Sequence, residues 1–176
     1  MILLYLTIIV ASNVITAMFP PFALFKGLLL IPAGSVFVGV TFLLRDFVQV
    51  QHGKRITYVV IAMATILSAT ISWAMGDTAF IASASVIAFL VSESMDTEIF
   101  SRTKKSFAWR VALSGIVGGM ADSLIFVVLG LSPIGADMLA WNQIPYAILG
   151  QALTKAVVQP IGVLGYVVIK KRGVIR

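Results

Sequence analysis

Six long apolar runs constrain the fold of this chain more than any other feature of its sequence. Hydrocarbon offers no partner to a backbone amide, so a run that crosses a bilayer must be helical. A crossing helix needs about 20 predominantly apolar residues, and these runs are too long and too uniform for barrel strands. We expect transmembrane helices at about residues 2–19, 28–44, 56–75, 79–95, 107–129 and 144–169.

The composition predicts an all-α integral membrane protein with a single domain over residues 1–176. Hydrophobic residues make up 60% of the chain and charged residues 11%, against about 45–50% and about 25% in soluble domains. Six spans with short connections leave no room for a soluble domain. The chain has no cysteine and one histidine, so we expect no disulfide, no metal site and no cofactor.

The basic residues predict an orientation. With six spans, both termini and two connections share one side of the membrane. That side has eleven of the thirteen Lys and Arg residues: Arg45, Lys54, Arg55, Arg102, Lys104, Lys105, Arg110, Lys170, Lys171, Arg172 and Arg176. The other side has Lys26, and Lys155 lies inside the last span. Because cytoplasmic loops carry the excess of Lys and Arg, we expect a multi-pass protein of the cell (inner) membrane with both termini in the cytoplasm.

Two ionisable residues, Asp122 and Lys155, lie deep within the fifth and sixth predicted spans. Such a residue costs at least about 2.5–3.5 kcal/mol at membrane depth and marks a functional-site hypothesis. Two helix faces with i, i+4, i+8 spacing carry them: Ser114, Gly118 and Asp122, then Gln151, Lys155 and Gln159. We expect Asp122 and Lys155 to be partners, because each lowers the cost of charging the other. The alternative is a structural ion pair that fixes helix register without a ligand.

Other polar residues leave two readings open. Asn13, in the first span, either contacts a ligand or bonds to a neighbouring helix. Glu93 and Asp96 share one face of the fourth span, and the alternative to a site there is a solvated helix end beside a basic loop. The neighbouring pair Arg45–Asp46 is interpreted as the interfacial end of the second span.

The sequence gives little support to catalysis. A serine nucleophile needs a base, and His52 lies in a predicted loop far from Ser114 and Ser123. An intramembrane aspartyl enzyme needs two deep aspartates, whereas Asp122 is the one deep aspartate here. There is no phosphate-binding loop of the P-loop type. We therefore do not expect an enzyme.

Five short patterns, in order along the chain, resemble the queuosine precursor transporters, a six-helix family also called VUT. The patterns are Asn13 in the first span; Pro32-Ala33-Gly34, then Arg45-Asp46-x-x-Gln49-x-x-x-Gly53-x-Arg55; Ser92-Glu93-x-x-Asp96-Thr97-x-Ile99-Phe100; Arg110-x-x-x-Ser114, then Asp122-Ser123-x-x-Phe126; and Gln151-x-x-x-Lys155. The chain departs from the pattern at Gln49, where many members carry an acid.

The resemblance implies uptake of 7-deazaguanine bases, in their 7-cyano or 7-aminomethyl form, for tRNA modification. It also implies kinship to the substrate-binding subunits of energy-coupling-factor vitamin importers. The chemistry agrees, since a guanine-like edge offers two N–H donors to a carboxylate and a carbonyl to Lys, Asn or Gln. A flat ring also needs an aromatic or apolar slot. The expected substrate-binding residues are Asn13, Glu93, Asp96, Ser114, Asp122, Ser123, Phe126, Gln151 and Lys155.

We thus expect an importer of a 7-deazaguanine base, with a small-molecule substrate, the lipid bilayer and no nucleic acid as partners. One alternative is a substrate-binding subunit for a vitamin-like molecule that docks on an ATPase module. Another is a non-transporting membrane protein with a structural ion pair. The preferred base, the energy source and a homodimeric state stay open.

Overall fold

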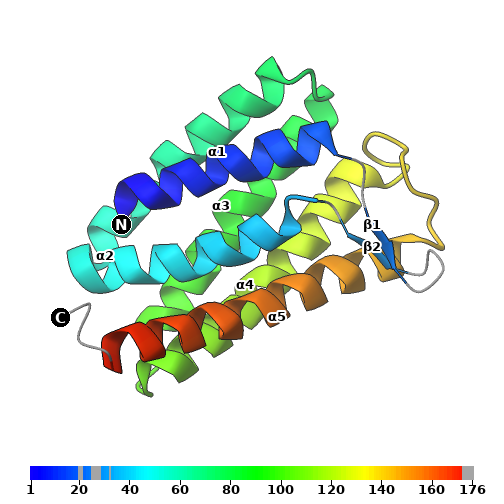
Figure 1. Ribbon diagram of the computed structural model, residues 1–176. Coiled ribbons are helices and arrows are strands. Elements are labelled where there is room, and N and C mark those ends of the chain that lie inside the picture. Colours follow the sequence, from blue (N-terminus) through cyan, green and yellow to red (C-terminus); the bar gives the residue numbers. More distant parts are fainter. Residues whose placement is uncertain (20–21, 25–28, 32, 172–176) are drawn as a thin grey trace.

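Five α-helices and a short hairpin form the part of the chain that the computed structural model describes, namely residues 1–19, 22–24, 29–31 and 33–171 (Figure 1). The elements are α1 (Ile2–Met18), β1 (Phe22–Leu24), β2 (Leu29–Ile31), α2 (Ser35–Ala74), α3 (Ala79–Arg102), α4 (Phe107–Phe126), the π-helical turn η1 (Val127–Leu131) and α5 (Ile144–Lys171). Lys26, Pro32, Arg172 and Arg176, used in the predictions above, lie outside the described residues.

Helix α2 consists of two arms joined at Gly53, which has φ 79° and ψ 167°. Glycine adopts a positive φ without the steric penalty of a Cβ, so the chain can turn there between two helices. The first arm runs towards this turn and the second returns from it towards the same side of the molecule, so the two arms are antiparallel (Figure 1). The sequence predicted a connection at residues 45–55, whereas the structure is helical on both sides of Gly53.

Two other boundaries differ from the prediction. Strand β2 occupies residues 29–31, so the second helix begins at Ser35 and not near residue 28. Helix α3 continues to Arg102, well past the predicted end at residue 95. Hydropathy predicted that the second helix ends near residue 44 and the fourth near residue 95, where charged residues begin. These charged residues are buried between α2 and α3, and both helices continue through them. The helices α1, α4 with η1, and α5 overlap the predicted ranges closely.

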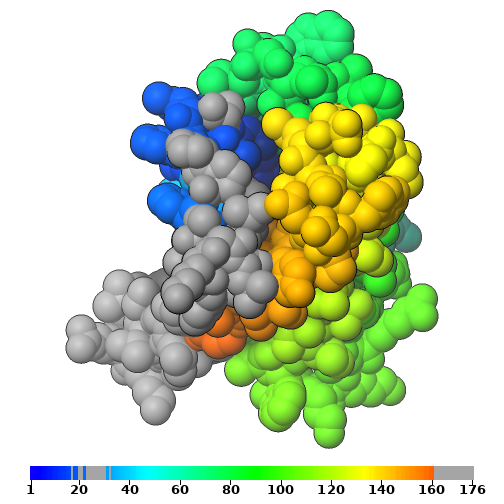
Figure 2. Space-filling model, turned by 90° about the vertical axis from the view of Figure 1, so that its right-hand side faces the viewer, coloured from blue at the N-terminus to red at the C-terminus, as the bar shows by residue number. Residues whose placement is uncertain are grey.

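The two ends of the bundle differ. The N-terminus, the turn between the two arms of α2 and the last turns of α5 lie at one end, called the terminal end below (Figure 1). The β1–β2 hairpin and the connections 75–78 and 132–143 lie at the other, called the hairpin end. Figure 2 views the hairpin end, where the 132–143 connection, in yellow, lies next to the start of α5, in orange. Helix α3 packs on α4 and α1 on α2, while α5 contacts both α2 and α4.

The distribution of polar residues fits a membrane protein. Charged and polar side chains such as Arg45, Glu93 and Lys155 are buried, while large apolar ones such as Ile66 and Trp109 are exposed. Ionisable residues of membrane proteins face the bundle interior in this way. Within the described residues, three helices are long and apolar enough to cross a membrane: Ser35–Ala74, Ala79–Arg102 and Phe107–Leu131. Six crossings and cytoplasmic termini stay predictions.

Candidate functional site

A cavity of about 140 Å³ lies among the helices on the hairpin side of the bundle centre. For comparison, a buried cavity of about 150 Å³ holds a benzene molecule. Every α-helix contributes to the walls, with two aromatic rings, Phe89 and Phe126, among them. The polar residues that line it are Ser12, Asn13, Thr16, Ser35, Thr41, Ser72, Asp77, Ser85, Asp122, Gln151 and Lys155.

An ion pair joins α4 to α5 in this cavity. Lys155 Nζ lies 2.5 Å from Asp122 Oδ2 and donates a hydrogen bond to Ser123 Oγ at 2.9 Å. The Lys155 side chain is 2% exposed and that of Asp122 14%, so the carboxylate faces the cavity more than the ammonium does. The predicted pairing of Asp122 with Lys155 is confirmed. Ser123 does not line the cavity but holds the Lys155 ammonium in place.

The small residues of α4 allow this close approach. A Cβ added at Gly119 would lie 3.4 Å from the Lys155 Cβ. On the neighbouring face, a Cβ at Gly118 would lie 3.0 Å from the Asp96 Cβ on α3. Glycine at these two positions therefore lets α3 and α5 both approach α4, as small residues do at membrane-helix interfaces.

Two amides bring further hydrogen-bonding groups to the cavity. Gln151 is 3% exposed, and its Nε2 has no hydrogen-bond partner among the described residues. A buried donor without a partner costs about 1–3 kcal/mol, so this amide is available to a ligand acceptor. Asn13 donates from Nδ2 to Ser68 Oγ at 2.8 Å, so it both joins α1 to α2 and lines the cavity.

Sequence reasoning missed the wall at the hairpin end. Asp77, in the α2–α3 connection, and Ser72, near the end of α2, both line the cavity. The Ser72 hydroxyl donates a short hydrogen bond to Asp77 Oδ2. Ser68 and Ser72 share one helix face at i, i+4 spacing, and this spacing is the signal that could have revealed the wall. Nothing local marks Asp77, because its place depends on how α2 and α3 meet.

Glu93 and Asp96, predicted for the site, belong to a separate buried cluster around Arg45. Arg45 Nε lies 3.0 Å from Glu93 Oε2, Arg45 Nη1 lies 3.0 Å from Asp46 Oδ1, and Arg45 Nη2 pairs with Asp96 Oδ2. These four side chains, which we call the Arg45 cluster, are at most 1% exposed. The interpretations of a solvated helix end and of an interfacial Arg45–Asp46 pair are both wrong. Arg45 is therefore not one of the basic loop residues on which the predicted orientation was based.

The Arg45 cluster lies closer to the terminal end than the cavity does. Along α2 the cavity wall ends at Thr41, one turn before Arg45. Along α3 it ends at Phe89, one turn before Glu93. Gln49 extends the polar contacts towards the terminal end, since it accepts from Arg45 Nη1 at 3.1 Å. The cluster therefore lies about one helical turn beyond the cavity, on the side of the terminal end.

Five of the nine predicted residues thus line one cavity: Asn13, Asp122, Phe126, Gln151 and Lys155. Ser114 does not, and its hydroxyl lies 3.5 Å from the Val111 carbonyl of its own helix. The described residues contain no cluster of three His, Cys, Asp or Glu that could hold a metal ion. The cavity offers hydrogen-bond donors and acceptors beside aromatic rings, as binding sites for small molecules do.

Comparison with known proteins identifies a family. The model of the family described as "Putative vitamin uptake transporter" matches residues 32–169, which is most of the chain. No curated protein and no solved structure matches.

Proposed function

Since the chain belongs to this family of vitamin uptake transporters, we propose that it imports a 7-deazaguanine base through the cavity between its helices. The observation that carries the proposal is the polar centre of the cavity, where Asp122, Lys155 and the unpartnered amide of Gln151 come together. A guanine-like edge has hydrogen-bond donors for the carboxylate and an acceptor for the amide.

The edge of such a base presents two adjacent N–H donors and one carbonyl acceptor. A carboxylate accepts two parallel N–H bonds, and these charge-assisted bonds are about twice as strong as neutral ones. Asp122 is the carboxylate in position, because its side chain is the more exposed member of its ion pair. Gln151 Nε2, which has no partner among the described residues, then donates to the carbonyl.

The remaining walls suit a flat ring. Phe89 and Phe126 line the cavity from α3 and α4, and aromatic side chains pack against planar ligands through their faces and edges. The volume of about 140 Å³ is on the scale of one small ring system. Of the nine expected residues, we propose Asn13, Asp122, Phe126, Gln151 and Lys155 as contacts, and Ser123 as the residue that positions Lys155.

The direction of import follows from the predicted orientation. The cavity reaches the hairpin end at the half-buried Asp77, and the Arg45 cluster lies beyond its other end, on the side of the termini. With cytoplasmic termini, the cavity in this conformation accepts substrate from outside the cell. The family description names vitamin uptake, so the second candidate is a chain that binds and imports a vitamin.

Uptake of radiolabelled 7-deazaguanine bases in cells that lack their own transporter tests the proposal. We expect uptake with this chain and at least about tenfold less with Asp122→Asn, because a charge-assisted contact contributes about 1.5–3 kcal/mol. Asp137→Asn is the matched control, since Asp137 is exposed and lies outside the cavity.

The Asp122→Asn change leaves Lys155 buried without its partner, so loss of folding must be separated from loss of binding. The double variant Asp122→Asn/Lys155→Met removes both charges together; we expect it to keep its helical structure and to lose uptake. If the unmodified chain takes up no deazaguanine, the proposal is refuted, and uptake of a vitamin would then establish the second candidate.

A further inference from the structure

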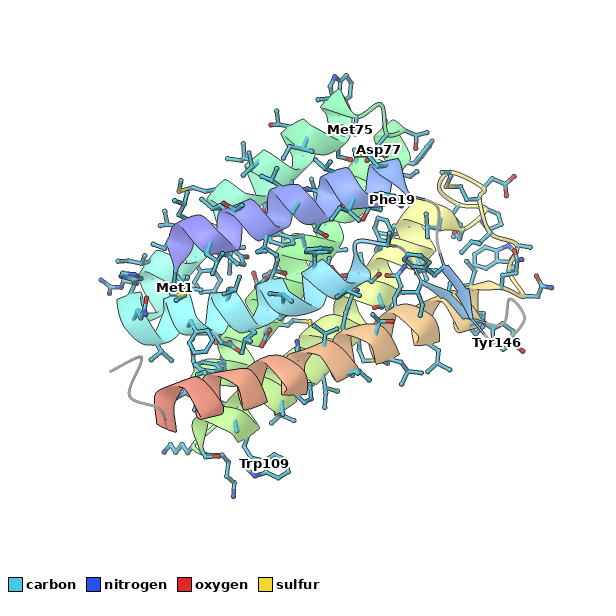
Figure 3. The ribbon with its side chains drawn as sticks, in the orientation of Figure 1. Met1, Phe19, Met75, Asp77, Trp109 and Tyr146 are labelled. Atoms are coloured by element: carbon cyan, nitrogen blue, oxygen red, sulfur yellow. The ribbon has the colours of Figure 1, made fainter. Side chains whose placement is uncertain are left out.

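We propose that Asp77 makes the cavity selective for cationic ligands, so that it prefers an amine-bearing base to a neutral one of the same shape. The inference rests on the proposed function, because it names which form of the base the same cavity favours. Asp77 is then the residue that determines specificity at the hairpin end of the site. Figure 3 labels Asp77 in the connection between α2 and α3.

The charges of the cavity are unbalanced. Among the described residues that line it, the charged ones are Asp77, Asp122 and Lys155. Asp122 and Lys155 neutralise each other in a 2.5 Å ion pair. Asp77 has no ion pair within the described part of the chain. The cavity thus carries one formal negative charge, which attracts cations and disfavours anions.

The position of the Asp77 carboxylate is fixed by its neighbours. Gly76 has φ 85°, which reverses the chain after α2 at a residue that tolerates this conformation. The Asp77 backbone N–H then donates to the Ser72 carbonyl at 3.1 Å, and its Oδ2 accepts from the Ser72 hydroxyl. These two bonds hold the carboxylate against the cavity wall, although Asp77 lies in a connection at the end of the bundle.

The second carboxylate oxygen is the group that a ligand ammonium would reach. Asp77 Oδ1 has no hydrogen bond within the described part of the chain. A base whose amide edge meets Asp122 and Gln151 directs its five-membered ring away from them, and the substituent at position 7 is on that ring. An aminomethyl group at this position is a primary ammonium at neutral pH, whereas a nitrile is neutral. Asp77 therefore distinguishes the two forms through charge.

Binding of the two bases to the purified chain in detergent tests the proposal. The probes are the 7-aminomethyl and 7-cyano forms of 7-deazaguanine, with wild type, Asp77→Asn and the control Asp137→Asn. We expect Asp77→Asn to weaken binding of the aminomethyl base about fivefold or more, as for a partly exposed ion pair, and to leave the cyano base within about twofold. Asp137→Asn removes the same charge from an exposed connection at the hairpin end and should change neither.

A salt titration of the wild type gives a second measurement that needs no variant. Salt screens the attraction of a half-exposed carboxylate, so we expect the preference for the aminomethyl base to shrink as salt rises. Equal loss of both bases in Asp77→Asn, or a preference that neither the variant nor salt alters, overturns the role of Asp77 and leaves the proposed function standing. If neither base binds to the wild type, the proposed function itself fails, and the inference with it.

Discussion

Replacing Arg45 with methionine tests what holds the buried carboxylates of the Arg45 cluster. The guanidinium contacts Asp46, Glu93 and Asp96, all with side chains at most 1% exposed. Removing one partner of a buried ion pair costs about 3–5 kcal/mol, because the remaining charge is left uncompensated. We expect Arg45→Met to lower the free energy of unfolding by about this amount, a factor of a hundred to several thousand in the folding equilibrium.

The assay is unfolding of the purified protein, followed by circular dichroism as SDS is added to detergent micelles. Arg102→Met is the matched control, because it makes the same replacement at a side chain that is 82% exposed and 3.3 Å from Glu98. An exposed pair of this kind contributes about 0–1 kcal/mol. In addition, Glu93→Gln placed in the Arg45→Met background should recover part of the loss, since it removes one uncompensated carboxylate.

If Arg45→Met costs no more than Arg102→Met, the buried cluster does not hold α2 and α3 together and the reasoning is refuted. A double variant no more stable than Arg45→Met would show that charge is not the cause, and that the loss comes from packing alone.

Two further substitutions probe the cavity itself. Gln151→Leu should reduce binding of the base about tenfold and leave the free energy of unfolding unchanged or higher, because it removes a buried Nε2 that has no partner in the described part of the chain. Equal losses in binding and stability would contradict this. Gly34→Ala should lower the free energy of unfolding by about 1–3 kcal/mol and reduce binding, because the added Cβ would lie 2.6 Å from the Ser12 carbonyl oxygen beside the cavity. A variant as stable as the wild type would contradict the close packing of α1 and α2.

The sequence predicted the parts of the fold that follow from local pattern. The long apolar runs gave helices, and the i, i+4 spacing placed Asp122 and Lys155 on facing sides of α4 and α5, where they pair at 2.5 Å. Gly118 was grouped with Asp122 on one helix face, and its neighbour Gly119 lies against Lys155. Each of these inferences depends only on residues within one helix or within two helices that follow each other in the chain.

The errors arise where a residue's environment comes from distant parts of the chain. Arg45 and Asp46 are a charged pair between two apolar runs, and hydropathy alone ends a helix there. Their burial depends on Glu93 and Asp96, which are about 50 positions away in the sequence and supply the countercharges. Asp77 was missed for the same reason, since a connection becomes a cavity wall through the packing of the helices around it.

The location of the Arg45 cluster has a consequence for turnover. A base that leaves the cavity towards the terminal end meets Arg45 and its carboxylates one helical turn below. The proposed exit route is thus crossed by the ion pairs that join α2 to α3, whereas the proposed entrance is bordered by the carboxylate of Asp77. For the proposed import, passage towards the terminal end therefore requires α2 and α3 to separate at these buried ion pairs.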